Sequence, residues 1–106
     1  MLKKQFRLDG KTIKNLFAGK LKKISNGNFT ILYTPNNLKH CRFTVICKKE
    51  NFKKATLRNK IKRQIYSLLF RLIKNNFFKQ NYDCIIIINQ TINDYQSLIN
   101  LLEKIF

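Results

Sequence analysis

The sequence predicts an α+β fold: a small, mixed four-stranded sheet packed with three helices, in the order α-β-β-β-α-β-α. In three segments apolar residues recur every three to four positions, as in amphipathic helices. Other segments are rich in β-forming residues, and one short run is apolar on both faces, as in a buried strand. A chain of 106 residues can bury one core, so we expect a single domain over residues 1–106.

The first expected helix covers residues 12–18. Ile13, Leu16 and Phe17 share one of its faces at positions i, i+3 and i+4, and Gly19 provides a stop. The basic residues 1–9 that precede this helix are expected to be extended or loosely held.

Three strands are expected next. Asn26-Gly27 is a strong hairpin signal, with a weak strand near residues 20–24 before it and a β-rich segment at 29–34 after it. Side chains of a strand alternate between two faces, so the third strand, at 41–48, presents two different surfaces. One surface carries Cys41, Phe43, Val45 and Cys47, and the other carries Arg42, Thr44, Ile46 and Lys48.

The second half of the chain is expected to form a long helix, a buried strand and a closing helix. Residues 54–76 carry a continuous apolar stripe at helical spacing, with polar residues on the other side. Four consecutive isoleucines within 82–89 suit a strand that is buried on both faces and parallel to a neighbour. Residues 91–106 form the last helix. The stripe of the long helix consists of Leu57, Ile61, Ile65, Leu68, Leu69, Leu72 and Ile73.

Charge is the outlying property of the chain. It has 22 basic and five acidic residues, a net charge of +17, and all but one of the basic residues lie within positions 1–79. Such a field attracts polyanions, so a nucleic acid, an anionic membrane or an acidic protein could be the partner. Most of the basic residues are lysines, which an AT-rich genome also favours, so the arginines are more informative. Three of the five lie in one segment, as Arg58, Arg63 and Arg71.

The sequence offers no recognisable catalytic or metal site. His40 and Cys41 are neighbours, and neighbours on a strand point to opposite faces. The five carboxylates are scattered, and the three cysteines have no metal-binding spacing. We therefore expect no catalytic residue and no metal ligand in the protein. The cysteines are expected to be buried free thiols, with no disulfide-linked partner.

The sequence has no signal-like stretch and no apolar run long enough to span a bilayer. A cytoplasmic protein that does not bind membranes is therefore expected.

The basic segment 48–63 is the strongest candidate binding site. On a helix, Asn59 and Arg63 lie one turn apart, and so do Arg58 and Lys62. Arginine offers paired donors to phosphate, asparagine can bridge phosphate and 2′-hydroxyl groups, and a helix N-terminus attracts anions. A merely solvated helix face is the alternative. The candidate RNA-binding residues are Lys48, Lys49, Lys54, Arg58, Asn59, Lys60, Lys62 and Arg63.

Arg58-Asn59-x-x-Lys62-Arg63 resembles the signature of the bacterial ribonuclease P protein component family. The resemblance extends over nearly the whole chain and depends on the order of the motifs. The other matching segments are Arg7-Leu8, Leu16-Phe17, the strand from Phe43 to Lys48-Lys49, the lead-in Lys54-Ala55-Thr56-Leu57, and Tyr82-Asp83 with the aliphatic residues that follow.

The resemblance implies a ribosomal-protein-like fold with a left-handed βαβ crossover. It also implies a protein subunit of ribonuclease P that binds the catalytic RNA and the 5′ leader of precursor tRNA. The holoenzyme is an endoribonuclease that removes the leader, and its RNA subunit carries the chemistry and the Mg²⁺. The signature helix would meet the catalytic RNA, and a cleft between the sheet and the first helix would take the leader. The implied leader-binding residues are Ile13, Phe17, Tyr33, Arg42, Thr44 and Ile46.

Two other functions fit the charge. A ribosomal or other structural RNA-binding protein without an enzymatic role could use the same basic helix. A module for anionic membranes could use the amphipathic segment 54–76, although its apolar stripe is better suited to covering a sheet.

Overall fold

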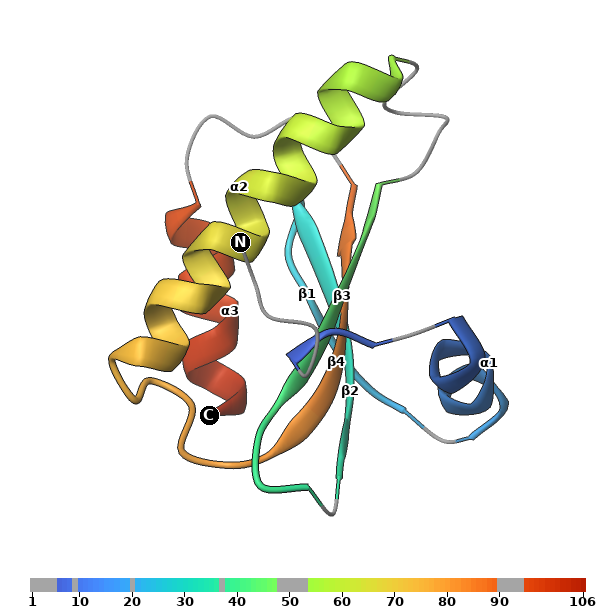
Figure 1. Cartoon of the computed structure of the whole chain (residues 1–106), viewed down its shortest axis with the longest axis vertical. Helices are drawn as coiled ribbons and strands as arrows, with labels where there is room; N and C mark the ends of the chain where they lie inside the picture. The colour runs from blue at the N-terminus through green and yellow to red at the C-terminus, as the bar shows by residue number, and fades with distance from the viewer. Residues whose placement is uncertain (1–5, 9, 20, 37, 48–53, 90–94) are drawn as a thin grey trace.

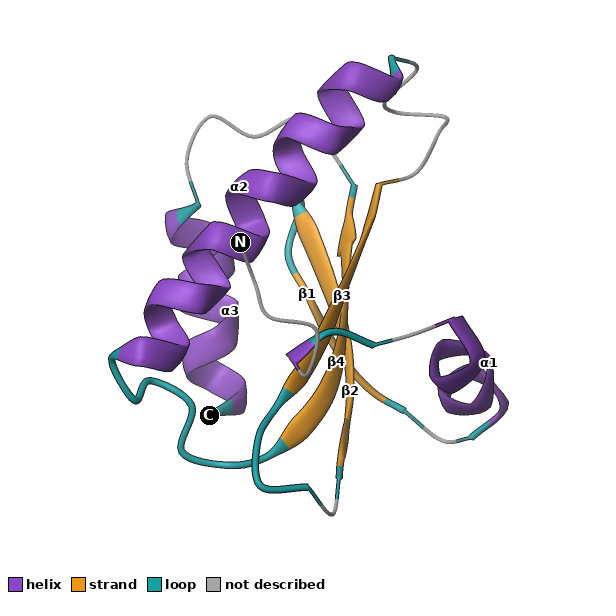
Figure 2. Ribbon diagram, viewed as in Figure 1, coloured by secondary structure: helices purple, strands orange, loops and turns teal. Residues whose placement is uncertain are grey.

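The computed structural model describes residues 6–8, 10–19, 21–36, 38–47, 54–89 and 95–106. The order of helices and strands is the predicted one, and Figure 2 shows a sheet with helices on both sides. The elements are α1 (Gly10–Ala18), β1 (Lys22–Ser25), β2 (Phe29–Pro35), β3 (Arg42–Cys47), α2 (Ala55–Lys74), β4 (Tyr82–Ile88) and α3 (Gln96–Ile105).

The strands form a mixed sheet in the order β1-β2-β4-β3. β4 pairs antiparallel with β2 and parallel with β3, so the parallel pairing expected of the isoleucine run is confirmed. β4 lies between two strands, which explains why four of its seven residues are apolar and buried. The hand of the β3-α2-β4 crossover remains a prediction.

The core lies between the sheet and the two C-terminal helices. Figure 1 shows α2 and α3 on one side of the sheet and α1 on the other. Alternate residues of β2, β3 and β4 point towards α2 and α3, among them Phe29, Phe43 and Ile86, which are fully buried. The predicted stripe of α2 supplies Ile61, Ile65, Leu68 and Leu69 to this core, while Leu57, Leu72 and Ile73 pack at its margin.

The helix ends lie within five residues of the predicted ones, and the end of α1 at Ala18 is the predicted one. α2 ends at Lys74, and Asn76 then adopts the left-handed conformation at φ 56°, which asparagine tolerates better than most residues. α3 begins at Gln96, whereas the last helix was expected from residue 91; residues 90–94 lie outside the described part of the chain.

The segment before α1 lies along the free edge of β3. The backbone N–H of Leu8 donates to the carbonyl oxygen of Phe43 at 2.9 Å, and Arg7 forms a parallel bridge with Phe43. Leu8 is buried, at 8% exposure. Of the two expected alternatives, the extended conformation is therefore confirmed for Arg7 and Leu8, and the edge of the sheet fixes their position.

Among the helices in the described ranges, none is both long enough and apolar enough to cross a bilayer.

Candidate nucleic-acid interface

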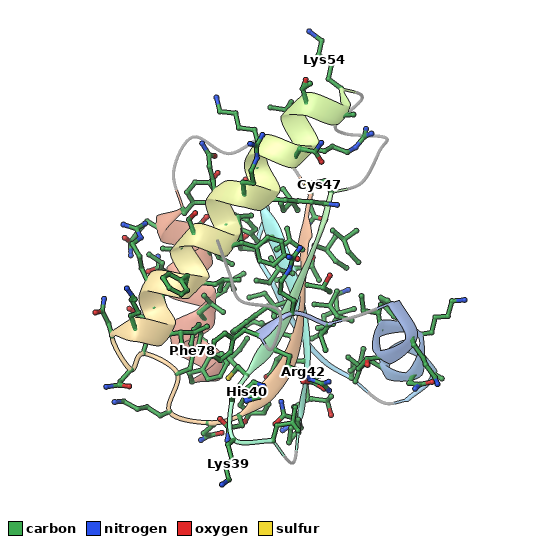
Figure 3. All side chains as sticks on the ribbon, in the orientation of Figure 1. Lys39, His40, Arg42, Cys47, Lys54 and Phe78 are labelled. Atoms are coloured by element: carbon green, nitrogen blue, oxygen red, sulfur yellow. The ribbon has the colours of Figure 1, made fainter. Side chains whose placement is uncertain are left out.

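One candidate interface is the outer side of the first half of α2, called here the basic face. Four of its six members are exposed, whereas Arg58 and Lys62 are half-buried beside the apolar stripe. Figure 3 shows Lys54 projecting beyond the end of the helix. The basic face consists of Lys54, Arg58, Asn59, Lys60, Lys62 and Arg63. The other two predicted RNA-binding residues, Lys48 and Lys49, lie outside the described residues.

The N-terminus of α2 adds to this positive potential. Lys54 occupies the cap position and makes no side-chain capping hydrogen bond, and the first turn contains no acidic residue. The positive end of the helix dipole is therefore not offset by its own sequence. The same backbone that positions the basic side chains thus favours an anionic partner.

A hollow of about 310 Å³ opens beside the basic face. Its lining includes Arg7, which is not among the candidate RNA-binding residues predicted from the sequence. The Arg7 guanidinium carbon lies 5.0 Å from the centre of the Tyr66 ring, within the range of a cation–π interaction. The hollow is lined by Arg7, Asn59, Lys62, Arg63 and Tyr66.

The second candidate interface is the open face, the sheet surface that points away from α2 and α3. Arg42, Thr44 and Ile46 lie on it, because they alternate with the core residues of β3, as predicted. Ile46 is half-buried, whereas Thr44 is only 8% exposed. Thr44 lies beside the fully buried Ile85 of β4, so this part of the surface offers little polar area.

Helix α1 lies on the same side of the sheet as the open face (Figure 1). None of its residues is buried. Ile13 is half-buried and Phe17 is 51% exposed, which is unusual for a large apolar side chain. Phe17 therefore has ring surface available to a partner.

Arg42 makes a bidentate ion pair with Asp83. Its Nε lies 2.9 Å from Oδ1 and its Nη2 lies 2.7 Å from Oδ2 of that carboxylate. The Asn36 side chain donates to the same Oδ1 at 2.9 Å, and Asp83 is only 4% exposed. The charge of Arg42 is thus offset within the fold, and the side chain joins two strands.

Tyr33 does not lie with the other predicted leader-binding residues. It follows Phe29 and Ile31 on the β2 surface that faces the helices, and it packs at the margin of the core. Its ring meets Tyr82 edge-on, with centroids 5.4 Å apart. The resemblance grouped Tyr33 with Arg42 in the leader site, but the sheet has Tyr33 on the face opposite to Arg42.

The cysteines are buried free thiols, as expected. Burial raises the pKa of the Cys84 thiol well above its ordinary value of 9.0, and it also raises the pKa values of Cys41 and Cys47. Protonated, buried thiols are poor nucleophiles and poor metal ligands. Among the described residues, no three His, Cys, Asp or Glu side chains are grouped so that they could hold a metal ion.

The chain is similar to known proteins in sequence and in fold. Residues 2–106 match the protein family described as Ribonuclease P. A ribonuclease P protein component of Histophilus somni is 36% identical over 86 residues, which cover 79% of this chain and 70% of that protein.

Solved structures of bacterial RNase P proteins share the fold. The protein from Thermotoga maritima superposes with a TM-score of 0.77 at 25% identity, covering 94% of this chain and 97% of that one. The protein from Staphylococcus aureus has a TM-score of 0.70 at 23% identity, covering 93% and 90% of the two chains.

Proposed function

Because the chain belongs to the ribonuclease P protein component family, which acts with the ribonuclease P RNA in processing the 5′ end of tRNA, we propose that its basic face binds that RNA. The observation that carries this proposal is the uncapped N-terminus of α2 together with six basic or amide side chains, four of them exposed and two half-buried. Contacts between basic side chains and RNA phosphates supply affinity that does not depend on the nucleotide sequence of the RNA. Lys48 and Lys49 would extend the same contact.

The open face and α1 form the proposed site for the 5′ leader of precursor tRNA. A leader is single-stranded, and single strands are bound by stacking bases on exposed aromatic rings. The half-exposed ring of Phe17, with Ile13 beside it on α1, is suited to this, and Ile46 offers apolar contact from the sheet. Arg42 and Thr44 would shape the floor of the site, since the ion pair and the burial leave them little free polar surface.

The chemistry belongs to the RNA subunit in this proposal. Phosphodiester hydrolysis requires a metal ion or an acid–base pair placed at the scissile bond. Mg²⁺ would be held by the RNA, and the protein would position the substrate. The whole chain, residues 1–106, would act as one ribonuclease P protein domain in the cytoplasm.

Leader binding can be tested with precursor and mature tRNA, which differ in the leader. Enzyme assembled with saturating Phe17→Ala protein should bind precursor tRNA about 5- to 150-fold more weakly, the value of roughly one stacked base. Its affinity for mature tRNA should hardly change. Phe17 is exposed, so the variant should melt as the wild type does.

Tyr33→Ala is the matched aromatic variant. Because Tyr33 lies on the other face, its loss should lower the free energy of unfolding and leave the preference for precursor tRNA intact. Equal losses for both tRNAs with Phe17→Ala, or a selective loss with Tyr33→Ala, would refute the proposed leader site.

A further inference from the structure

We propose that Arg7, held against the ring of Tyr66, completes a phosphate-binding pocket that takes one backbone phosphate of the catalytic RNA. The inference rests on the proposed function, because it extends the basic face of α2 to a residue from the other end of the chain. The pocket is the hollow of about 310 Å³ described above.

The pairing of residues 7 and 8 with the edge strand β3 brings Arg7 close to α2. The Leu8 N–H bonds to the carbonyl oxygen of Phe43 at 2.9 Å, and the Arg7 backbone bridges to the same residue. Leu8 is buried, so this short extended segment is anchored. Neighbouring side chains on an extended segment point in opposite directions, and the side chain of Arg7 therefore leaves on the side of Tyr66.

Tyr66 is itself fixed at both ends. Its ring is half-buried at the margin of the core, and its hydroxyl oxygen accepts a hydrogen bond from the backbone N–H of Val45 at 3.2 Å. The ring thus spans from α2 to β3 and presents a face to the Arg7 guanidinium, 5.0 Å from its centre. A flexible arginine is held in one place by a rigid aromatic surface.

The charges around the hollow favour an anion. Among the five described residues that line it, three are cations, Arg7, Lys62 and Arg63, and none is acidic. Like charges that face one hollow repel one another, and a phosphate relieves that repulsion. Asn59 adds an amide that can reach a 2′-hydroxyl, and arginine can bind phosphate through two parallel hydrogen bonds.

The position of the hollow indicates which RNA supplies the phosphate. Asn59, Lys62 and Arg63 belong to the basic face of α2, whereas the proposed leader site lies on the opposite side of the sheet (Figure 1). The catalytic RNA is therefore the expected ligand, and the precursor leader is not.

The test measures the affinity of the full chain for a bacterial ribonuclease P RNA at several salt concentrations. Arg7→Ala should weaken binding by about tenfold, and the salt dependence should fall by about one released counterion. Arg71→Ala is the matched control, because Arg71 is an exposed arginine of the same helix that does not line the hollow. Its effect on affinity should be clearly smaller.

Variants of Tyr66 test whether its ring acts by holding Arg7 in place or by contacting the RNA directly. Tyr66→Leu removes the ring and should weaken binding nearly as much as Arg7→Ala, with little further loss in the double variant. Tyr66→Phe keeps the ring and should bind nearly as the wild type does. Thermal melting of each variant shows whether it is folded under the binding conditions.

The inference would be overturned by wild-type affinity for Arg7→Ala, by equal losses for Arg7→Ala and Arg71→Ala, or by fully additive losses for Arg7→Ala and Tyr66→Leu. An Arg7→Ala effect confined to precursor tRNA in the preassembled enzyme would also overturn it. If the wild-type protein did not bind the RNA, the proposed function itself would fail, which is a different outcome.

Discussion

Asp83 is a nearly buried carboxylate whose charge is balanced by Arg42 across the β3–β4 pair. Arg42→Ala would leave that charge uncompensated except for the Asn36 amide. We expect the free energy of unfolding to fall by about 2–4 kcal/mol, less than for a fully buried pair because Arg42 is partly exposed. Urea denaturation measures the loss.

A second substitution distinguishes a charge effect from lost packing. Replacing Asp83 by Asn in the Arg42→Ala protein removes the unpaired charge and should restore part of the stability. If the double variant were less stable than Arg42→Ala alone, the ion-pair explanation would be wrong.

The buried thiol of Cys84 makes stability depend on alkaline pH. Its pKa is raised in the folded protein, so above pH 9.0 the unfolded state loses a proton that the folded state keeps. Stability from this group is complete below that pH and falls above it, by up to about 1.4 kcal/mol per pH unit.

Urea denaturation of wild type and Cys84→Ala over a range of pH tests this sign. The stability advantage of the wild type should shrink above pH 9.0, because alanine has no proton to lose. A constant difference between the two proteins at all pH values would contradict the expectation.

At the scale of elements, α2 has two faces with separate tasks. Leu69 is fully buried, so Leu69→Ala should lower the free energy of unfolding by about 2–5 kcal/mol. Arg63 is exposed, so Arg63→Ala should leave stability within about 0.5 kcal/mol and weaken binding to the catalytic RNA. Urea denaturation and RNA titration of both variants measure the separation, and a large stability loss for Arg63→Ala would contradict it.

Local patterns predicted the elements well where one period dominated. The strict alternation in 41–48 gave β3 and both of its faces, and the isoleucine run gave a parallel, buried β4. β2 was harder, because Ile31, Leu32 and Tyr33 place apolar side chains on both faces and leave the parity undetermined. The pattern alone therefore could not assign Tyr33 to either face of the sheet.

The contacts that complete the candidate site could not be predicted from any local sequence pattern. Arg7 reaches Tyr66 because residues 7 and 43 pair along a sheet edge, and Arg42 meets Asp83 because of the β3–β4 register. These contacts join segments some forty to sixty residues apart. The motif in α2 identified the basic face, but the partners that it gains in three dimensions depend on the fold.

At the scale of the whole molecule, the basic residues and the last elements of the core lie in different parts of the chain. Nearly all basic residues precede residue 80, while the last quarter supplies the central strand β4 and the core helix α3. The chain therefore combines a scaffold that is nearly free of basic residues with a strongly cationic remainder. A strongly cationic remainder of this kind attracts polyanions such as RNA.

Reconstitution tests the central claim, that this chain assists an RNA enzyme and does not cut RNA by itself. The purified protein is added to a bacterial ribonuclease P RNA and precursor tRNA at low Mg²⁺, and release of the 5′ leader is measured. We expect no cleavage by the protein alone, little by the RNA alone, and efficient cleavage by the two together. Cleavage by RNA-free protein, or no stimulation of an RNA that another bacterial RNase P protein does activate, would contradict the claim.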